Sequence, residues 1–162
     1  MARFRVDGFL ADSMLGRLTR WLRMMGYSVE YAASDWSDTR IMEYCTRSGL
    51  FLLTRDRELS KRYSHSLYVL SENINDQLEM FLSEFPPSRE LFFTRCPLCN
   101  GKTSRVPMIK VSDRVPEGVR GRYDSAFVCL NCGKVYWEGT HYDSILKTIN
   151  SIITRLGDHR TH

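Results

Sequence analysis

Four of the five cysteines occur as two Cys-x-x-Cys pairs, Cys96 with Cys99 and Cys129 with Cys132, and a glycine follows each pair within two residues. Such pairs supply the four thiolates of a tetrahedral zinc site, with Zn–S bonds of about 2.3 Å. We therefore expect one structural Zn²⁺ bound by all four side chains. Four protein ligands leave no open position on the metal, so this zinc would not be catalytic.

The alternative chemistry for these cysteines is a pair of redox-active dithiols. Redox Cys-x-x-Cys motifs occur in a βαβ setting, which this part of the chain lacks. The residues between the pairs, 100–128, instead suit a zinc ribbon with a long hairpin insertion. The fifth cysteine, Cys45, lies on the apolar face of an expected helix and is predicted to be a core thiol.

Acidic side chains follow each of the first four expected strands. Parallel strands end at one edge of a sheet, where ligands bind near a topological switch point, so these carboxylates should lie at one edge. Carboxylate oxygens suit Mg²⁺ or Mn²⁺. Each acid is equally suited to cap the helix that follows it, Asp12 included. The acids are Asp12, then Asp35 and Asp38, then Asp56, then Glu72 and Asp76.

The order of the expected elements predicts an α/β fold. Short apolar segments alternate with amphipathic helical segments, which is typical of a parallel sheet with right-handed crossovers. The segment 50–53 is apolar throughout, as expected for a strand covered on both faces. We expect strands over 4–10, 29–32, 50–53 and 67–70, and helices over 14–25, 38–47, 58–63 and from about 74 to 85.

The first helix has two distinct sides. Its apolar residues, Met14 among them, recur on one side at about 100° per residue, and Gly26 ends the helix. Arg17, Arg20 and Arg23 fall on the opposite side, where we expect a solvated face.

The second half of the chain differs in character from the first. Residues 86–90 suit a linker between two domains. The ribbon insertion after them is basic, and Tyr123 and Phe127 lie near its cations, which is typical of a nucleic-acid surface. Thr140 and Asp143 match a capping box at the start of a last helix that should pack on the body of the protein, and 158–162 should be a frayed tail. The basic residues are Lys102, Arg105, Lys110, Arg114, Arg120 and Arg122.

Composition limits the classes of protein. The chain has 162 residues and a net charge of +4, which permits RNA binding without establishing it. No apolar run approaches the ~18 residues of a membrane span, and charged residues interrupt the start of the chain where a signal peptide would be apolar. We expect a cytoplasmic or nuclear protein that makes no contact with membranes.

Four stretches together resemble the Mut-seven C-terminal RNase family. They are LADSMLGRLTRWLRMMGY, LLTRDREL, RCPLCNG and CLNCGKVYWEGTHY, and they span residues 10–142. The resemblance implies a PIN-like three-layer α/β/α nuclease domain, here 1–88, joined to a zinc ribbon with a C-terminal helix, here 89–162. It also implies metal-dependent cleavage of RNA.

The resemblance assigns the acids to a catalytic site. Asp12 and Asp56 match its acids in FLAD and LLTRD, and Asp38 matches the acid at the start of the second helix, with Asp35 as the alternative. Asp76 is the fourth candidate, ahead of Glu72. Asp12, Asp38 and Asp56 would hold Mg²⁺ or Mn²⁺, while Arg17 and Arg55 would hold the substrate phosphate or stabilise the charge of the pentavalent transition state.

Two functions of other classes fit the same sequence. The chain is alternatively an RNA-binding module without cleavage, whose acids are only helix caps. It is also compatible with a protein-interaction module that docks on a ribonucleoprotein through the ribbon and the last helix.

Overall fold

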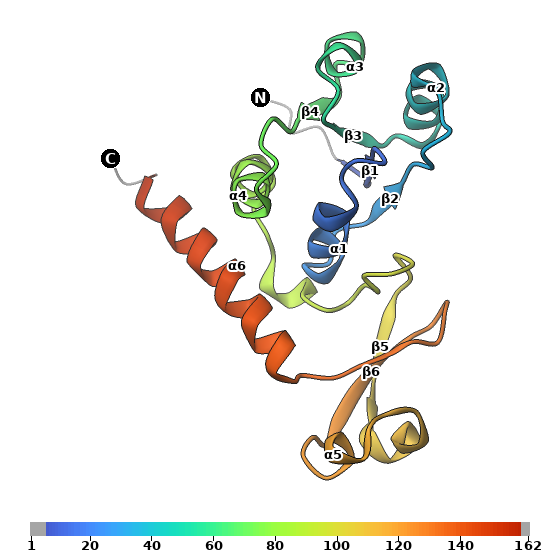
Figure 1. Cartoon of the computed structure of the whole chain (residues 1–162), viewed down its shortest axis with the longest axis vertical. Coiled ribbons are helices and arrows are strands. Elements are labelled where there is room, and N and C mark those ends of the chain that lie inside the picture. The colour runs from blue at the N-terminus through green and yellow to red at the C-terminus, as the bar shows by residue number, and fades with distance from the viewer. Residues whose placement is uncertain (1–5, 160–162) are drawn as a thin grey trace.

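A parallel sheet of four strands forms the centre of the first half of the chain. The computed structural model describes residues 6–159 (Figure 1). The strand order is β2-β1-β3-β4, all parallel, with Leu10 of β1 opposite Glu30 of β2 and Leu52 of β3. The α/β prediction is therefore confirmed. The strands are β1 (Phe9–Ala11), β2 (Val29–Tyr31), β3 (Phe51–Thr54) and β4 (Ser66–Tyr68).

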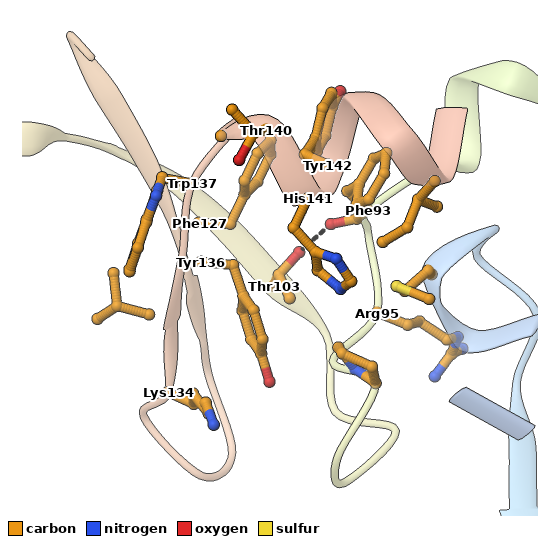
Figure 2. Close-up of a pocket in the computed structure, with 15 residues that line it drawn as sticks. Phe93, Arg95, Thr103, Phe127, Lys134, Tyr136, Trp137, Thr140, His141 and Tyr142 are labelled. Carbon is orange, nitrogen blue, oxygen red and sulfur yellow. Dashed lines mark hydrogen bonds between the residues drawn. The ribbon is translucent and has the colours of Figure 1, made fainter. Parts of the chain in front are cut away.

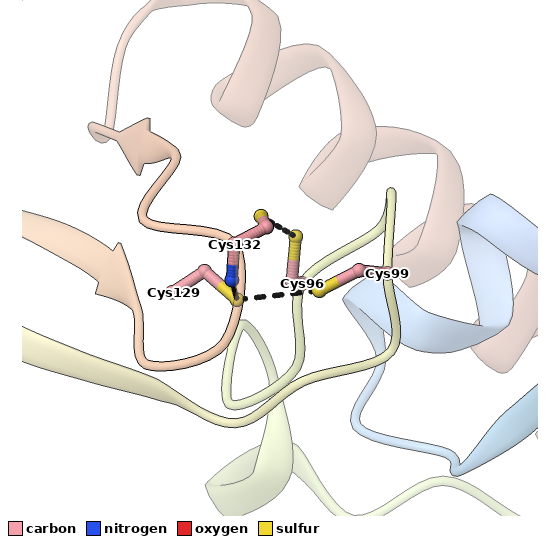
Figure 3. A group of neighbouring side chains, drawn as sticks. All are labelled: Cys96, Cys99, Cys129 and Cys132. Atoms are coloured by element: carbon pink, nitrogen blue, oxygen red, sulfur yellow. Dashed lines mark hydrogen bonds between the residues drawn. The ribbon is translucent and has the colours of Figure 1, made fainter.

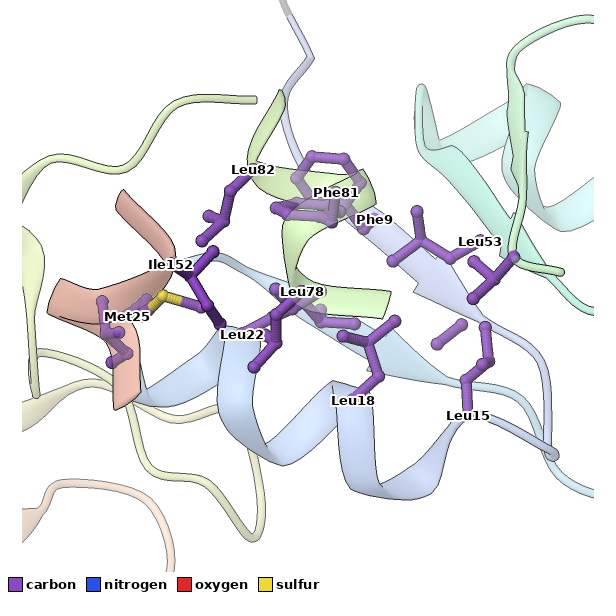
Figure 4. Packing of buried hydrophobic residues seen from close by; sticks show 14 of the residues in the cluster. Phe9, Leu15, Leu18, Leu22, Met25, Leu53, Leu78, Phe81, Leu82 and Ile152 are labelled. Atoms are coloured by element: carbon purple, nitrogen blue, oxygen red, sulfur yellow. The ribbon is translucent and has the colours of Figure 1, made fainter. Parts of the chain in front are cut away.

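The helices cover the sheet in two layers because successive side chains of a strand point to opposite faces. Phe9 and Ala11 of β1 join the core under α1 and α4, whereas Leu10 joins the core under α2 and α3 (Figures 1 and 4). Cys45 is fully buried in the second core, as expected, and burial raises the pKa of its thiol to about 12. The helices are α1 (Gly16–Met24), α2 (Asp38–Ser48), α3 (Arg57–Arg62) and α4 (Ile74–Glu84).

The starts of the first strand and the first helix differ from the prediction. The first strand begins at Phe9; the residues from 4 to 5 that were assigned to it lie outside the described part, as do 160–162 of the expected tail. The first helix begins at Gly16, so Met14 precedes it and is 66% exposed instead of packing in the core.

A three-stranded antiparallel sheet forms the ribbon. Strand β6 (Ser125–Cys129) lies between β5 (Thr103–Pro107) and β7 (Val135–Tyr136). The expected long hairpin is present, since β5 and β6 pair antiparallel; short helical turns fill the connection between them and enclose their own small core, which includes Met108 and Val115. These turns are η2 (Met108–Lys110), η3 (Ser112–Arg114) and α5 (Glu117–Arg120); a further turn, η1 (Arg89–Leu91), precedes the ribbon.

The last helix, α6 (Thr140–His159), returns to the α/β domain and lies along α4 (Figure 1). Ile145, Ile149 and Ile152 are buried in the same core as α1 and α4. Arg155 adds an ion pair to Glu79 of α4 at 3.7 Å. The packing of this helix on the body of the protein is therefore confirmed. No helix of the described residues combines the length and the apolar character that crossing a bilayer requires.

Replacement of Ile149 by Ala tests how much α6 stabilises the α/β domain. Ile149 is fully buried, so its truncation should leave a cavity and lower the free energy of unfolding by about 2–5 kcal/mol. Ser151→Ala, at an exposed position of the same helix, is the matched control and should change it by less than about 0.5 kcal/mol. Urea unfolding followed by circular dichroism measures both, and equal stability of the two variants would contradict the packing role of α6.

Candidate functional site

The strand order places a topological switch point between β1 and β3. The chain leaves β1 for β2 on one side and later returns to form β3 on the other side. The carboxyl ends of β1 and β3 therefore border the crevice in which α/β proteins bind ligands. Asp12 follows β1 directly, and Arg55 and Asp56 follow β3.

The Asp12 carboxylate joins the ends of these two strands. Its Oδ2 accepts hydrogen bonds from Thr54 Oγ1 at 2.6 Å and from Arg55 N at 2.8 Å, and its Oδ1 accepts one from Met14 N at 3.0 Å. The side chain is only 7% exposed. Helix α1 has Leu15 at its N-cap position, without a side-chain cap. The alternative in which Asp12 caps this helix is therefore wrong.

Thr54 links the two acids of the switch point. Its hydroxyl donates to Asp12 and accepts a hydrogen bond from Asp56 N at 2.9 Å, and the residue is fully buried. A buried hydroxyl needs such partners. Sequence reasoning missed Thr54; the available signal was a hydroxyl residue at the end of an otherwise apolar strand, directly before the acid-bearing turn.

Asp56 caps helix α3. Its Oδ1 accepts a hydrogen bond from Leu59 N at 3.0 Å, in the geometry of an N-cap residue, and the residue is exposed. Two carboxylate oxygens offer about four acceptor sites. Capping therefore occupies one part of the Asp56 carboxylate and leaves acceptor capacity for a ligand.

The other candidate acids begin helices α2 and α4. Ser37 caps α2, so Asp38 lies in its first turn, 3.5 Å from Arg62 Nη1. Asp76 lies in the first turn of α4 and accepts a hydrogen bond from Ser71 Oγ at 2.9 Å. Asp35 and Asp76 are both exposed. These positions near helix N-termini favour the negative charges.

Arg55 lies across the same edge. Its Nη1 and Nη2 are each 3.4 Å from Glu72 Oε1, and Nη2 is 3.3 Å from Leu70 O. Its side chain is 21% exposed, and its Nε is buried without a hydrogen-bond partner. Arg17 is exposed on α1.

The acids share an edge without forming a closed cluster. Within residues 6–159, four cysteines are the only Asp, Glu, His or Cys side chains that meet in a group of three or more with ligand atoms within 4.8 Å of one another. A joint metal site of Asp12, Asp38 and Asp56 would require these side chains to approach one another more closely.

The four predicted cysteines come together (Figure 3). Cys96 Sγ lies 3.8 Å from Cys132 Sγ, and Cys99 Sγ lies 3.4 Å from Cys129 Sγ. These separations exclude S–S bonds. A tetrahedron with Zn–S bonds of about 2.3 Å has edges of about 3.8 Å. The cluster can therefore hold a structural metal such as zinc.

Hydrogen bonds to sulfur prepare this cluster for a metal. Asn131 Nδ2 and Gly101 N each donate to Cys99 Sγ at 3.4 Å, and together they lower the pKa of the Cys99 thiol to about 6. The thiolate, which is the metal ligand, is then present at neutral pH. A Cβ on Gly101 would lie 2.7 Å from the Asn131 Cβ, so the position requires glycine.

Arg23 holds the first Cys-x-x-Cys turn, residues 96–99 (the first knuckle), against the α/β domain. The prediction that Arg23 is solvated is wrong. Only 7% of Arg23 is exposed; its Nε donates to Val29 O at 2.8 Å, and its Nη1 donates to Pro97 O and Leu98 O at 3.1 Å. Asn100 adds a second link through Val29 N at 3.0 Å. Arg17 and Arg20 are exposed, as expected.

The fold and the site define a parallel α/β domain whose acids line the carboxyl edge of the sheet, followed by a ribbon with a four-cysteine metal site. The comparison with protein families agrees with the sequence resemblance: the family model described as Mut7-C RNAse domain matches residues 7–149. The chain belongs to this family. Neither the curated proteins nor the solved structures gave a match.

Loss of the Asn131 amide should weaken metal binding without removing a ligand. Asn131→Ala deletes the side-chain donor to Cys99, so the pKa of Cys99 should rise and zinc affinity at pH 7 should fall about 10- to 100-fold, as for other partners of metal ligands. Asn75→Ala, at an exposed position of α4, is the matched control. Competition with a chromophoric chelator measures both affinities, and an unchanged affinity in Asn131→Ala would show that this hydrogen bond has no role in holding the metal.

Proposed function

We propose that the protein is a metal-dependent ribonuclease whose α/β domain is PIN-like and cleaves RNA at the carboxyl edge of its sheet. The observation that supports this most strongly is the connection of Asp12 to the start of the Asp56 turn through the Thr54 hydroxyl, at the switch point of a Mut7-C RNAse domain. The connection holds two acids of different strands beside the crevice where ligands bind in such sheets.

The residues at this edge fit a hard divalent cation. All candidate ligands are carboxylate oxygens, which Mg²⁺ and Mn²⁺ prefer. Asp12, Asp56 and Asp38 would hold the ion, with Asp35 as the alternative to Asp38 and Asp76 as a further ligand. When bound, the ion supplies activation of a water molecule and stabilisation of the leaving oxygen. The Asp38–Arg62 contact is exposed and long, so a rearrangement of Asp38 costs little.

The arginines at this edge fit the phosphate. Arg55 Nε is a buried donor without a partner, and such a group gains from a hydrogen bond to an anion. Glu72, which faces the Arg55 guanidinium, is 85% exposed and can leave it for solvent. In this proposal Arg55 binds the scissile phosphate and Arg17 binds the strand beside it, while the four cysteines hold a structural Zn²⁺.

One observation favours the alternative of an RNA-binding module without cleavage. Each acid already has a structural partner, Asp56 as a helix cap and Asp38 in an ion pair, and the acids do not close into one cluster. A chain that uses its acids only in this way would bind RNA without cutting it.

Asp56→Asn separates the two functions. Asn caps a helix about as well as Asp, so the melting temperature should stay within about 2 °C of the original, since a ΔΔG below about 0.5 kcal/mol shifts it by no more than about 2 °C in a chain of this size. If Asp56 holds the metal, the loss of one charged ligand should lower the rate of RNA cleavage at least about 100-fold, and Asp12→Asn should do the same. Asp113→Asn, an exposed carboxylate of the ribbon, is the matched control and should cleave normally.

Cleavage of single-stranded and structured RNAs with Mg²⁺ or Mn²⁺ gives the readout. Full activity in Asp56→Asn would refute the proposed site. A lack of cleavage by the unmodified protein with both metals, together with retained RNA binding, would establish the binding module instead.

A further inference from the structure

A cavity of about 440 Å³ lies between the ribbon, the start of α6 and the end of α1 (Figure 2). This cavity is separate from the carboxyl edge of the sheet. Five aromatic rings line it, and they come from the segment before the ribbon, from the ribbon itself and from α6. They are Phe93, Phe127, Tyr136, Trp137 and Tyr142. Its size and its aromatic lining are those of a pocket for a small planar group.

Phe93 and Tyr142 are in direct ring contact within this lining. Their ring centroids are 4.0 Å apart at 30°, and Phe127 lies 6.4 Å from Phe93. The two rings are therefore stacked on each other, and a further planar group can stack only on an outer face of the pair. Nucleobases stack on aromatic rings in this way, and each stacked base contributes about 1–3 kcal/mol to binding.

The backbone of Phe93 has an unusual conformation. Its φ is +62°, a left-handed value that bulky residues rarely adopt. Two hydrogen bonds hold it there: Phe93 N donates to Met24 O at 2.7 Å, and Thr103 Oγ1 donates to Phe93 O at 2.6 Å. Strained residues of this kind cluster at ligand-binding sites, and here the strain places the aromatic ring against Tyr142 in the cavity wall.

The charge of the cavity suits a phosphate. Arg95, Lys134 and His141 line it, and its lining includes no acidic residue. Lys134 and His141 are exposed. Proteins bind single-stranded nucleic acid with aromatic rings beside cations. The cavity offers both, rings for the base and cations for the phosphate of a nucleotide.

Helix α1 connects the cavity with the carboxyl edge of the sheet. Met24, its last residue, lines the cavity, and the exposed Arg17 and Arg20 lie on the same side of the helix at about 100° per residue. From Gly16 to Met24 the helix rises about 12 Å at 1.5 Å per residue. These arginines form a cationic line between the proposed cleavage edge and the cavity.

We infer that the cavity binds one nucleotide of a single-stranded RNA, with the base on the Phe93–Tyr142 surface and a phosphate at Lys134 and His141, while Arg17 and Arg20 contact the strand that continues toward the sheet edge. This inference rests on the proposed function for the identity of the ligand as RNA. It does not require cleavage, because the cavity contacts RNA away from the acids.

Binding of a labelled 12-nucleotide oligo(A) RNA, measured by fluorescence anisotropy with zinc-loaded protein and no Mg²⁺ or Mn²⁺, tests the cavity. Tyr142→Leu should weaken binding about tenfold at every salt concentration, since it removes a stacking surface and no charge. Lys134→Glu should weaken binding and make its salt dependence shallower, since it removes a phosphate contact. Lys147→Glu makes the same charge change at an exposed position of α6 outside the cavity and should alter affinity less than twofold.

An abasic RNA of the same length isolates the base contact. It should bind unmodified protein and Tyr142→Leu equally, because neither then has a base to stack. Unmodified affinity of both Tyr142→Leu and Lys134→Glu for oligo(A) would overturn the inference and leave the cavity to an apolar ligand. Cleavage is scored separately. If the protein binds RNA through the cavity but never cleaves it, only the proposed nuclease activity is refuted. If the protein cleaves RNA and the cavity variants bind RNA with unchanged affinity, only the proposed role of the cavity is refuted.

Discussion

The buried carboxylate of Asp12 is the constraint on which the sheet edge depends. An ionised carboxylate that is almost fully removed from water needs hydrogen bonds, or its burial is very costly. Thr54, Arg55 and Met14 supply three. These bonds fix the end of β1 against the end of β3, and they take up the Met14 N–H, so that helix α1 begins only at Gly16.

A second polar contact fixes the ribbon relative to this edge. Arg23 is buried between α1, β2 and the first knuckle, and burial lowers the pKa of its guanidinium while the nearby Cys99 and Cys96 oppose that change. A buried guanidinium with several acceptors has one favourable geometry. Because α6 also returns from the ribbon to pack beside α4, the ribbon is held at both of its ends, and the cavity beside it keeps a defined place relative to the sheet.

The sequence allowed prediction of features that depend on local pattern. The cysteine spacing predicted the cluster, the alternation of apolar segments predicted the parallel sheet, and the isoleucines of the last helix predicted its packing. Features that depend on a distant partner were not predictable. Arg23 lies on the polar side of α1 in the sequence pattern, and its Nη1 is covered by Pro97 and Leu98 of the first Cys-x-x-Cys turn, more than 70 residues later. The role of Thr54 likewise requires Asp12, 42 residues earlier.

The acids at the sheet edge are compensated one by one by contacts within the fold. Asp56, Asp38 and Asp76 lie at the N-termini of α3, α2 and α4, where the helix dipole stabilises negative charge. Asp12 is stabilised by hydrogen bonds. The fold itself therefore supplies part of the charge compensation at this edge, whereas the four thiol groups of the ribbon have a metal as their natural partner. An ion at the sheet edge must compete with helix caps and ion pairs. An RNA phosphate that binds together with the ion would add oxygen ligands to it. These ligands would help the ion to displace the helix caps and ion pairs of the acids.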